Sequence, residues 1–161
     1  DVDPAPRLWQ ALLAADLVKL SQEEMDYLAQ PLGGGAEGEA AVRSRILGGA
    51  AHWLIITDGA APIRSVTRKA AGRVQAFRVE VRDTTAAGDA FVGGLLFRLG
   101  ERGGDGRGFA AFCENTGDME DAIRFGAAVG ALAVTRKGAF AAMPSLDEVR
   151  QILQQQTEHA A

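Results

Sequence analysis

The stretch "DTTAAGDAFVGG", residues 83–94, places two hydroxyl residues and a run of very small residues between two aspartates, Asp83 and Asp89. An apolar segment, residues 91–99, follows immediately and predicts a helix from about residue 88 to residue 99. The first backbone N–H groups of a helix have no partner within it, and the helix dipole adds partial positive charge there. Because Ala86, Ala87 and Gly88 carry almost no side chain, an anion could approach these N–H groups closely. The stretch therefore predicts an anion-binding loop at a helix N-terminus.

Asp89 gives this loop a chemical interpretation. A carboxylate beside a bound phosphate would be repelled, so its presence favours a general base that takes a proton from a hydroxyl attacking the phosphate. The first hypothesis is therefore phosphoryl transfer to an alcohol. The alternative is that Asp83 and Thr84 only cap the helix, because such residues are favoured at that position. The sequence does not contain the Walker pattern of an ordinary P-loop.

Composition and charge limit the classes of partner. The chain has 161 residues, 47% hydrophobic and 24% charged, which is typical of one globular domain. A net charge of −4 argues against a nucleic-acid partner, because phosphate binding needs clustered lysines and arginines. The longest strongly apolar run, Gly126 to Val134, is too short to span a bilayer. The single cysteine, Cys113, excludes an internal disulfide and is typical of a reducing compartment, so we expect a cytoplasmic protein.

The hydrophobic pattern alternates between strands and helices and predicts an α/β fold with a mainly parallel sheet. Strands are expected at residues 15–20, 52–57, 63–68 and 74–81. Helices are expected at residues 7–15, from Ser21 to about residue 29, and at 39–47, 88–99, 119–135 and near "PSLDEV". "SQEE" at 21–24 and the pair Ser145 and Glu148 have capping-box spacing.

The residues also resemble a known family. "DTTAAGDAFVGGLL" resembles the D-T-x-G-A-G-D signature of the ribokinase-like (pfkB) carbohydrate kinases. "ADLVKLSQEE", "LIITDGAAP" and "GALAVTRKGAFAAMPSLDEV" occur in the family's order and spacing. "DVDPAPRLW" resembles a stretch found in fructokinases, and "KLS" and "TRKGA" look most like bacterial fructokinases. The resemblance implies a ribokinase-like three-layer α/β/α fold. It implies that residues 1–161 form a single α/β nucleotide-binding and catalytic half, the C-terminal half of a sugar kinase, without the N-terminal half and lid.

The implied activity is ATP-dependent phosphorylation of a sugar hydroxyl, with fructose converted to fructose 6-phosphate. The implied cofactors are ATP, Mg²⁺ and K⁺, and a complete chain is expected to be a homodimer that acts on a small sugar, without nucleic-acid or membrane partners. The alternatives are a 2-keto-3-deoxygluconate kinase, a ribokinase-type enzyme, or a non-catalytic nucleotide-binding or oligomerisation module. An isolated half is expected to be inactive and to self-associate, because it leaves a strand edge and apolar faces uncovered.

The resemblance also implies residue roles. Asp89 matches the catalytic base, and Ala86, Ala87 and Gly88 with the Asp89 amide match the anion hole. Asp83 and Thr85 match residues near a monovalent-cation site. The positions that match the nucleotide site are Lys19, Ser21, Glu24 (toward Mg²⁺ through water), Thr57, Gly59, Ala127, Gly130 and Gly138. All of these except Gly138 have a structural alternative: a capping box for Ser21 and Glu24, a plain turn for Thr57 to Gly59, a surface strand residue for Lys19, and helix packing for Ala127 and Gly130.

Two positions depart from the family pattern. Ala86 stands where most members have glycine, and alanine disfavours positive φ. The anion hole is therefore expected to keep its shape only if Ala86 has ordinary dihedral angles. Ala5 stands where the family usually has asparagine, and we expect this change to matter least for the catalytic step.

Overall fold

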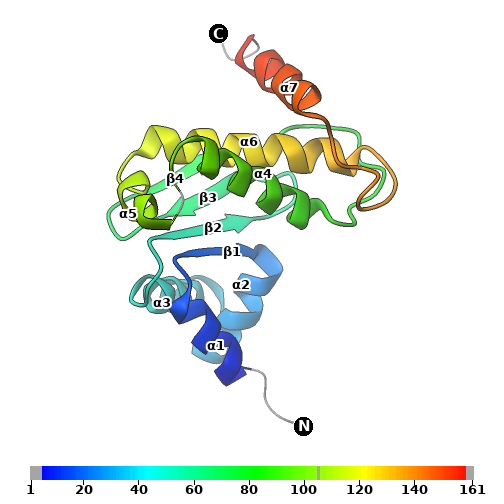
Figure 1. Cartoon of the computed structure of the whole chain (residues 1–161). Helices are drawn as coiled ribbons and strands as arrows, with labels where there is room; N and C mark the ends of the chain where they lie inside the picture. The colour runs from blue at the N-terminus through cyan, green and yellow to red at the C-terminus, as the bar shows by residue number, and fades with distance from the viewer. Residues whose placement is uncertain (1–4, 105, 159–161) are drawn as a thin grey trace. The chain divides into compact units, whose positions relative to one another are not determined.

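The computed structural model describes residues 5–104 and 106–158 (Figure 1). It divides the chain into two compact units, Asp1–Arg73 and Val74–Ala161, where the sequence predicts a single domain. Within the part of the chain that the structure describes, no helix has the length and apolarity needed to cross a membrane.

The first unit is built on a sheet of four strands in the order β1-β2-β3-β4. β1 (Leu17–Ser21) runs parallel to β2 (Trp53–Thr57), while β3 (Ile63–Val66) is antiparallel to β2. β4 (Ala71–Val74) completes the order. The α/β class is confirmed, but the sheet is mixed rather than mainly parallel. The short connection between β2 and β3 explains this, because a parallel pair needs a long crossover.

The strand expected at residues 74–81 does not form as predicted. β4 covers Ala71–Val74 instead, and residues 75–80 are not assigned to a strand. Val74 and Phe77 are the buried residues here, three positions apart, so burial does not follow the two-residue period of a strand. The alternation of residue types in this segment therefore does not correspond to two faces of a sheet.

Three helices accompany these strands. They are α1 (Ala5–Ala14), α2 (Gln22–Ala29), which continues into η1 (Gln30–Leu32), and α3 (Gly35–Leu47). α3 begins four residues before the expected start, and one of the glycines in its first turns, Gly38, packs against the end of α2. A Cβ on Gly38 would lie 2.5 Å from the carbonyl oxygen of Ala29, so only glycine allows α3 to approach the end of α2 this closely.

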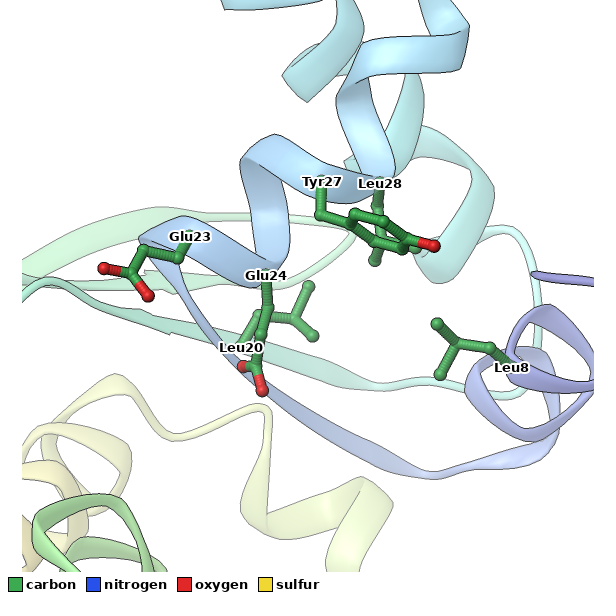
Figure 2. A pocket seen from close by; sticks show the side chains of 6 residues that line it. All are labelled: Leu8, Leu20, Glu23, Glu24, Tyr27 and Leu28. Atoms are coloured by element: carbon green, nitrogen blue, oxygen red, sulfur yellow. The ribbon is translucent and has the colours of Figure 1, made fainter. Parts of the chain in front are cut away.

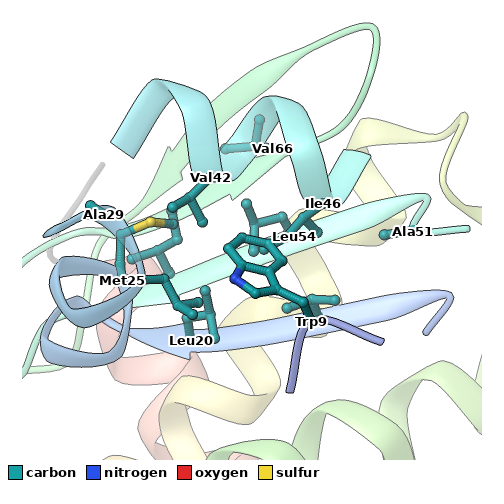
Figure 3. Packing of buried hydrophobic residues seen from close by; sticks show 12 residues of the cluster. Trp9, Leu20, Met25, Ala29, Val42, Ile46, Ala51, Leu54 and Val66 are labelled. Atoms are coloured by element: carbon teal, nitrogen blue, oxygen red, sulfur yellow. The ribbon is translucent and has the colours of Figure 1, made fainter. Parts of the chain in front are cut away.

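The hydrophobic core of this unit lies between the helices and the strands. Figure 3 shows Trp9 of α1, Met25 of α2 and Ile46 of α3 converging on Leu54 of β2. Met25, Ile46 and Leu54 are fully buried, which places the apolar stripe of each helix against the sheet. The Arg45 guanidinium lies 4.0 Å from the Trp9 ring centroid and covers the one tryptophan at the edge of this core.

The second unit is helical. It contains α4 (Ala87–Glu101), η2 (Gly106–Gly108), α5 (Phe109–Phe112), α6 (Thr116–Val134) and α7 (Leu146–Glu158). The expected helices at 88–99 and 119–135 and the helix after Ser145 are confirmed, and the short α5 was not predicted. α4 packs along α6 through glycines: a Cβ on Gly126 would lie 2.8 Å from the carbonyl oxygen of Phe91. Arg98 of α4 also pairs with Asp121 of α6 at 2.7 Å.

Candidate anion-binding and nucleotide site

The N-terminus of α4 has no side-chain cap. The helix begins at Ala87, and its N-cap residue, Ala86, has φ 61° and ψ 11° with no side-chain capping hydrogen bond. Asp89 lies in the first turn and is exposed. Small residues, uncapped N–H groups and an accessible carboxylate therefore occur together at this helix end, as the sequence predicts.

As far as the structure describes the chain, α2 and α6 begin with a side-chain cap, whereas α3 and α5, like α4, have none. Ser21 caps α2 and Asn115 caps α6 through side-chain oxygens. At α4, the carboxylate of Asp83 instead bonds the N–H of Thr85 and of Gly138. The alternative in which Asp83 and Thr84 merely cap this helix is therefore wrong for Asp83, and no capping contact of Thr84 is present among the described residues.

Ala86 departs from the expectation of ordinary dihedral angles. It is the one non-glycine residue with positive φ in the described ranges. An L-residue in this left-handed conformation costs about 1–2 kcal/mol relative to the right-handed one. The turn is nevertheless closed by hydrogen bonds from the Ala87 N–H to the Thr84 carbonyl (3.2 Å) and from the Ala90 N–H to the Ala86 carbonyl (2.8 Å). The condition of ordinary dihedral angles is therefore not met: alanine adopts here, with strain, the left-handed conformation that glycine adopts without it, and the turn still forms.

Asp83 anchors residues 83–86, which we call the 83–86 loop. Its Oδ1 accepts the Thr85 N–H at 2.9 Å, and its Oδ2 accepts the Gly138 N–H at 3.0 Å. These hydrogen bonds, that from Gly138 foremost, lower the pKa of Asp83 to about 2, so the carboxylate is ionised at neutral pH. The N–H groups of Arg82 and Asp83 also donate to the Val134 carbonyl at 2.8 and 3.1 Å. The loop is therefore fixed to the C-terminal end of α6 and the segment after it.

Sequence reasoning predicted Asp83 and Gly138 as site residues but missed that they bond one another. They lie 55 positions apart, and no local pattern connects them. Thr85, expected near a cation, contributes its N–H to the Asp83 carboxylate.

Ala127 and Gly130 lie in the contact between α4 and α6. Ala127 is buried, and a Cβ on Gly130 would lie 3.3 Å from the carbonyl oxygen of Ala87 and 3.5 Å from the Cβ of Phe91. The helix-packing interpretation describes these contacts directly. Gly130 lets the first turn of α4 lie close against α6, which supports the uncapped helix end from behind.

The remaining predicted residues belong to the first unit. Ser21 and Thr57 are register partners at the C-terminal ends of the parallel strands β1 and β2. Gly59 follows in the turn after β2, with φ 49°. Lys19 is half-buried on β1, opposite Ile55. Ser21, Thr57 and Gly59 thus gather at the edge of an α/β sheet where ligands commonly bind.

Ser21 and Glu24 form the predicted capping box. The Ser21 Oγ accepts the Glu24 N–H at 3.1 Å, and Glu24 Oε2 accepts the Ser21 N–H at 2.7 Å. This engages one carboxylate oxygen of Glu24. No group of three or more His, Cys, Asp or Glu side chains that could hold a metal ion is found among the residues described.

An apolar hollow of about 270 Å³ lies beside this capping box, lined by Leu8, Leu20, Glu23, Glu24, Tyr27 and Leu28. Figure 2 shows Leu8, Leu20 and Tyr27 entering it from α1, β1 and α2, with Glu23 at its margin. The apolar lining and the two carboxylates disfavour a phosphate here. The hollow therefore adds nothing to the anion-binding features.

The chain has an α/β fold in which α4 begins without a side-chain cap and carries the exposed carboxylate of Asp89 in its first turn. The chain belongs to the pfkB family of carbohydrate kinases, because the family's profile, "pfkB family carbohydrate kinase", matches residues 2–146.

Relatives of this chain include fructokinases. "Probable fructokinase-5" of Arabidopsis thaliana is 33% identical over 144 residues, which cover 89% of this chain and 41% of the relative. The structure of a Xylella fastidiosa fructokinase with bound ATP has a TM-score of 0.91 and 47% identity, covering 97% of this chain and 48% of that one. A Vibrio cholerae fructokinase in a fructose, ADP and potassium ion bound form has a TM-score of 0.72 and 33% identity, covering 89% and 42%. A ribokinase of Thermotoga maritima has a TM-score of 0.69 and 25% identity, covering 94% of this chain and 48% of that one, so the fold is ribokinase-like. The chain spans less than half the length of these relatives.

Proposed function

We propose that this chain is the nucleotide-binding and general-base part of a sugar kinase that transfers a phosphoryl group from ATP to a sugar hydroxyl, with fructose as the acceptor and fructose 6-phosphate as the product. The observation that carries the proposal is the uncapped N-terminus of α4, with Ala86 in the left-handed conformation and Asp89 in the first turn. Two similar solved proteins support the choice of ligands. The Xylella fastidiosa fructokinase has bound ATP, and the Vibrio cholerae fructokinase has bound fructose and ADP.

The residues fit the nucleotide. The small side chains at 86–88 leave room for phosphate oxygens at the first turn of α4. The Ala87 N–H is engaged by the Thr84 carbonyl, so the N–H groups of Gly88 and Asp89 would stabilise charge on the transferring phosphoryl group. Asp89 would accept the proton of the attacking hydroxyl, which its exposure allows. Thr57 and Gly59 would contact the phosphates or ribose, beside Lys19, Ser21 and Glu24. Gly138 and the packed residues Ala127 and Gly130 would border the base.

The residues also fit the ions. Mg²⁺ keeps several waters and is usually held by one or two carboxylates together with substrate phosphates, so Glu24 could act through water without a dedicated metal cluster. Mg²⁺ would neutralise charge on the phosphates. Asp83, ionised and fixed by two N–H groups, and Thr85, two residues later, would form part of a K⁺ site.

The test is calorimetric titration of the 161-residue chain with ATP and Mg²⁺, with and without K⁺. We expect saturable binding that strengthens with K⁺. Asp89→Asn removes a negative charge near the phosphates, so this variant should bind ATP at least as tightly as the wild type while abolishing phosphoryl transfer. Transfer is assayed with fructose, 2-keto-3-deoxygluconate and ribose, on the chain and on a longer protein that contains it.

The outcomes separate the alternatives. Turnover retained by Asp89→Asn would contradict the base assignment. Preference for another sugar would identify a different kinase of the same family. ATP binding without transfer in any longer protein would favour a non-catalytic nucleotide-binding module, and no ATP binding by a folded sample would contradict the proposal.

A further inference from the structure

The carboxylate of Glu148 makes two different kinds of contact. Its Oε2 accepts the Ser145 N–H at 2.8 Å and the Ser145 hydroxyl at 3.0 Å, and the Glu148 N–H donates to the Ser145 Oγ at 3.4 Å. These contacts form the capping box that starts α7. The other carboxylate oxygen of Glu148, Oε1, accepts a hydrogen bond from a guanidinium nitrogen of Arg136. The second contact is not needed for the cap.

Arg136 lies at the beginning of the segment that meets the 83–86 loop. Its N–H donates to the Ala133 carbonyl at 3.3 Å, which continues the last turn of α6. Two residues later, Gly138 turns the chain with φ 91° and donates its N–H to Asp83. The segment 136–138 is thus attached to the last turn of α6 at one end. Two further contacts hold it: Arg136 bonds Glu148 of α7, and Gly138 bonds Asp83 before α4.

We propose that Arg136 and Glu148 are positioning residues, whose ion pair fixes the segment 136–138 so that the Gly138 N–H meets Asp83 and holds the 83–86 loop in its left-handed turn. The consequence for nucleotide binding rests on the proposed function. The consequence for the loop itself does not.

The ion pair of Arg136 and Glu148 is better suited to positioning the segment 136–138 than to stabilising the whole fold. Both side chains of the pair are 39% exposed, and pairs of this kind contribute little to global stability. Arg136 is nevertheless the largest cause that lowers the pKa of Glu148 to about 2, so the pair is fully charged at neutral pH. A weak contact can still select one conformation of a short segment, because local conformations differ by much less free energy than the folded and unfolded states do.

The test separates the ion pair from the cap. Glutamine satisfies a capping box as glutamate does, so Glu148→Gln keeps the start of α7 and removes the charge that faces Arg136. Arg136→Gln removes the same pair from the other side and leaves Glu148 in place. Asp147→Asn is the matched control, because Asp147 also lies in the first turn of α7 and contacts Arg150 at 3.4 Å.

Two spectroscopic measurements on the 161-residue chain report the position of the loop. In Glu148→Gln and Arg136→Gln, we expect the Gly138 amide proton to exchange about tenfold faster. We also expect the Asp83 carboxyl, followed by NMR, to titrate closer to the ordinary aspartate value of about 3.9. The double variant should show no more than either single change, because both remove one interaction. Asp147→Asn should match the wild type.

ATP affinity is measured in parallel. We expect both single variants to bind ATP about fivefold more weakly than the wild type and the control. Unchanged Gly138 exchange and Asp83 titration in both variants would overturn the positioning role, as would equal changes in the control. If the wild type does not bind ATP at all, the proposed function fails while the two NMR measurements still decide the role of the ion pair.

Discussion

The carboxylate of Asp83 and the backbone N–H of Gly138 are joined by a 3.0 Å hydrogen bond across 55 positions of sequence. This bond connects the turn before α4 with the turn after α6. The two helices already pack closely through Gly126 and Gly130, so their ends meet where the 83–86 loop lies. Asp83 therefore fixes the shape of the loop, whether or not it also contacts a cation.

Acid should weaken the fold through Asp83. The folded-state pKa of Asp83, about 2, lies below the ordinary aspartate value of about 3.9. A depressed pKa stabilises the folded state above the unfolded value, and this contribution is lost as the pH falls through about 2. We therefore expect Asp83→Asn to be less stable than the wild type at pH 5, with the difference shrinking between about pH 4 and pH 2.

Urea unfolding of both proteins at several pH values measures this effect. Repeating the series in high salt is the control, because salt screens distant charges and leaves short hydrogen bonds nearly unchanged. A difference between the two proteins that does not depend on pH would mean that the Asp83 carboxylate is not held by these N–H groups in solution.

Ala86→Gly should stabilise the chain. Alanine carries strain at φ 61°, and glycine adopts this conformation without it. Part of the gain is offset by the greater freedom of glycine in the unfolded chain, so the net expectation is roughly 0.5–1 kcal/mol in the free energy of unfolding. Ala87→Gly is the matched control, since the same change inside the first turn of α4 should lower the free energy of unfolding by a similar amount. If Ala86→Gly also destabilised the chain, as Ala87→Gly should, this would argue against a left-handed Ala86.

Features that depend on residues close in sequence were predicted correctly, and features that depend on contacts between distant segments were not. The capping boxes of Ser21 and Ser145 and the strand at Trp53–Thr57 were predicted correctly because each depends on neighbours within a few residues. The conformation of Ala86 and the bond from Asp83 to Gly138 were not, because packing between distant segments determines them. Residues 75–80 alternate like a strand yet form none, since a strand also needs a partner.

The glycines of the α4–α6 contact should not tolerate alanine. A Cβ on Gly126 would lie 2.8 Å from the Phe91 carbonyl oxygen and 3.2 Å from the Leu95 nitrogen, both of which are backbone atoms that cannot move aside alone. Gly126→Ala should therefore cost roughly 1–3 kcal/mol in the free energy of unfolding. Gly93, on the same helix pair, has nothing within 4 Å of its Cβ position. Gly93→Ala should be neutral or stabilise by about 0.5–1 kcal/mol. Thermal unfolding of both variants decides, and a stable Gly126→Ala protein would contradict the close approach.

Glu24 offers a way to separate a cap from a metal role. Its Oε2 accepts the Ser21 N–H at 2.7 Å, and glutamine can make the same hydrogen bond. Glu24→Gln should therefore leave the free energy of unfolding nearly unchanged, whereas Glu24→Ala loses the reciprocal cap and should cost about 0.5–2 kcal/mol.

If Glu24 also acts toward Mg²⁺, Glu24→Gln should weaken ATP binding in the presence of Mg²⁺ and leave binding without Mg²⁺ unchanged, because only the charged oxygen attracts the hydrated ion. Calorimetry under both conditions gives the comparison. Equal affinities of the wild type and Glu24→Gln with Mg²⁺ would assign Glu24 to the cap alone, and the ion would then be held by the phosphates and by other oxygens.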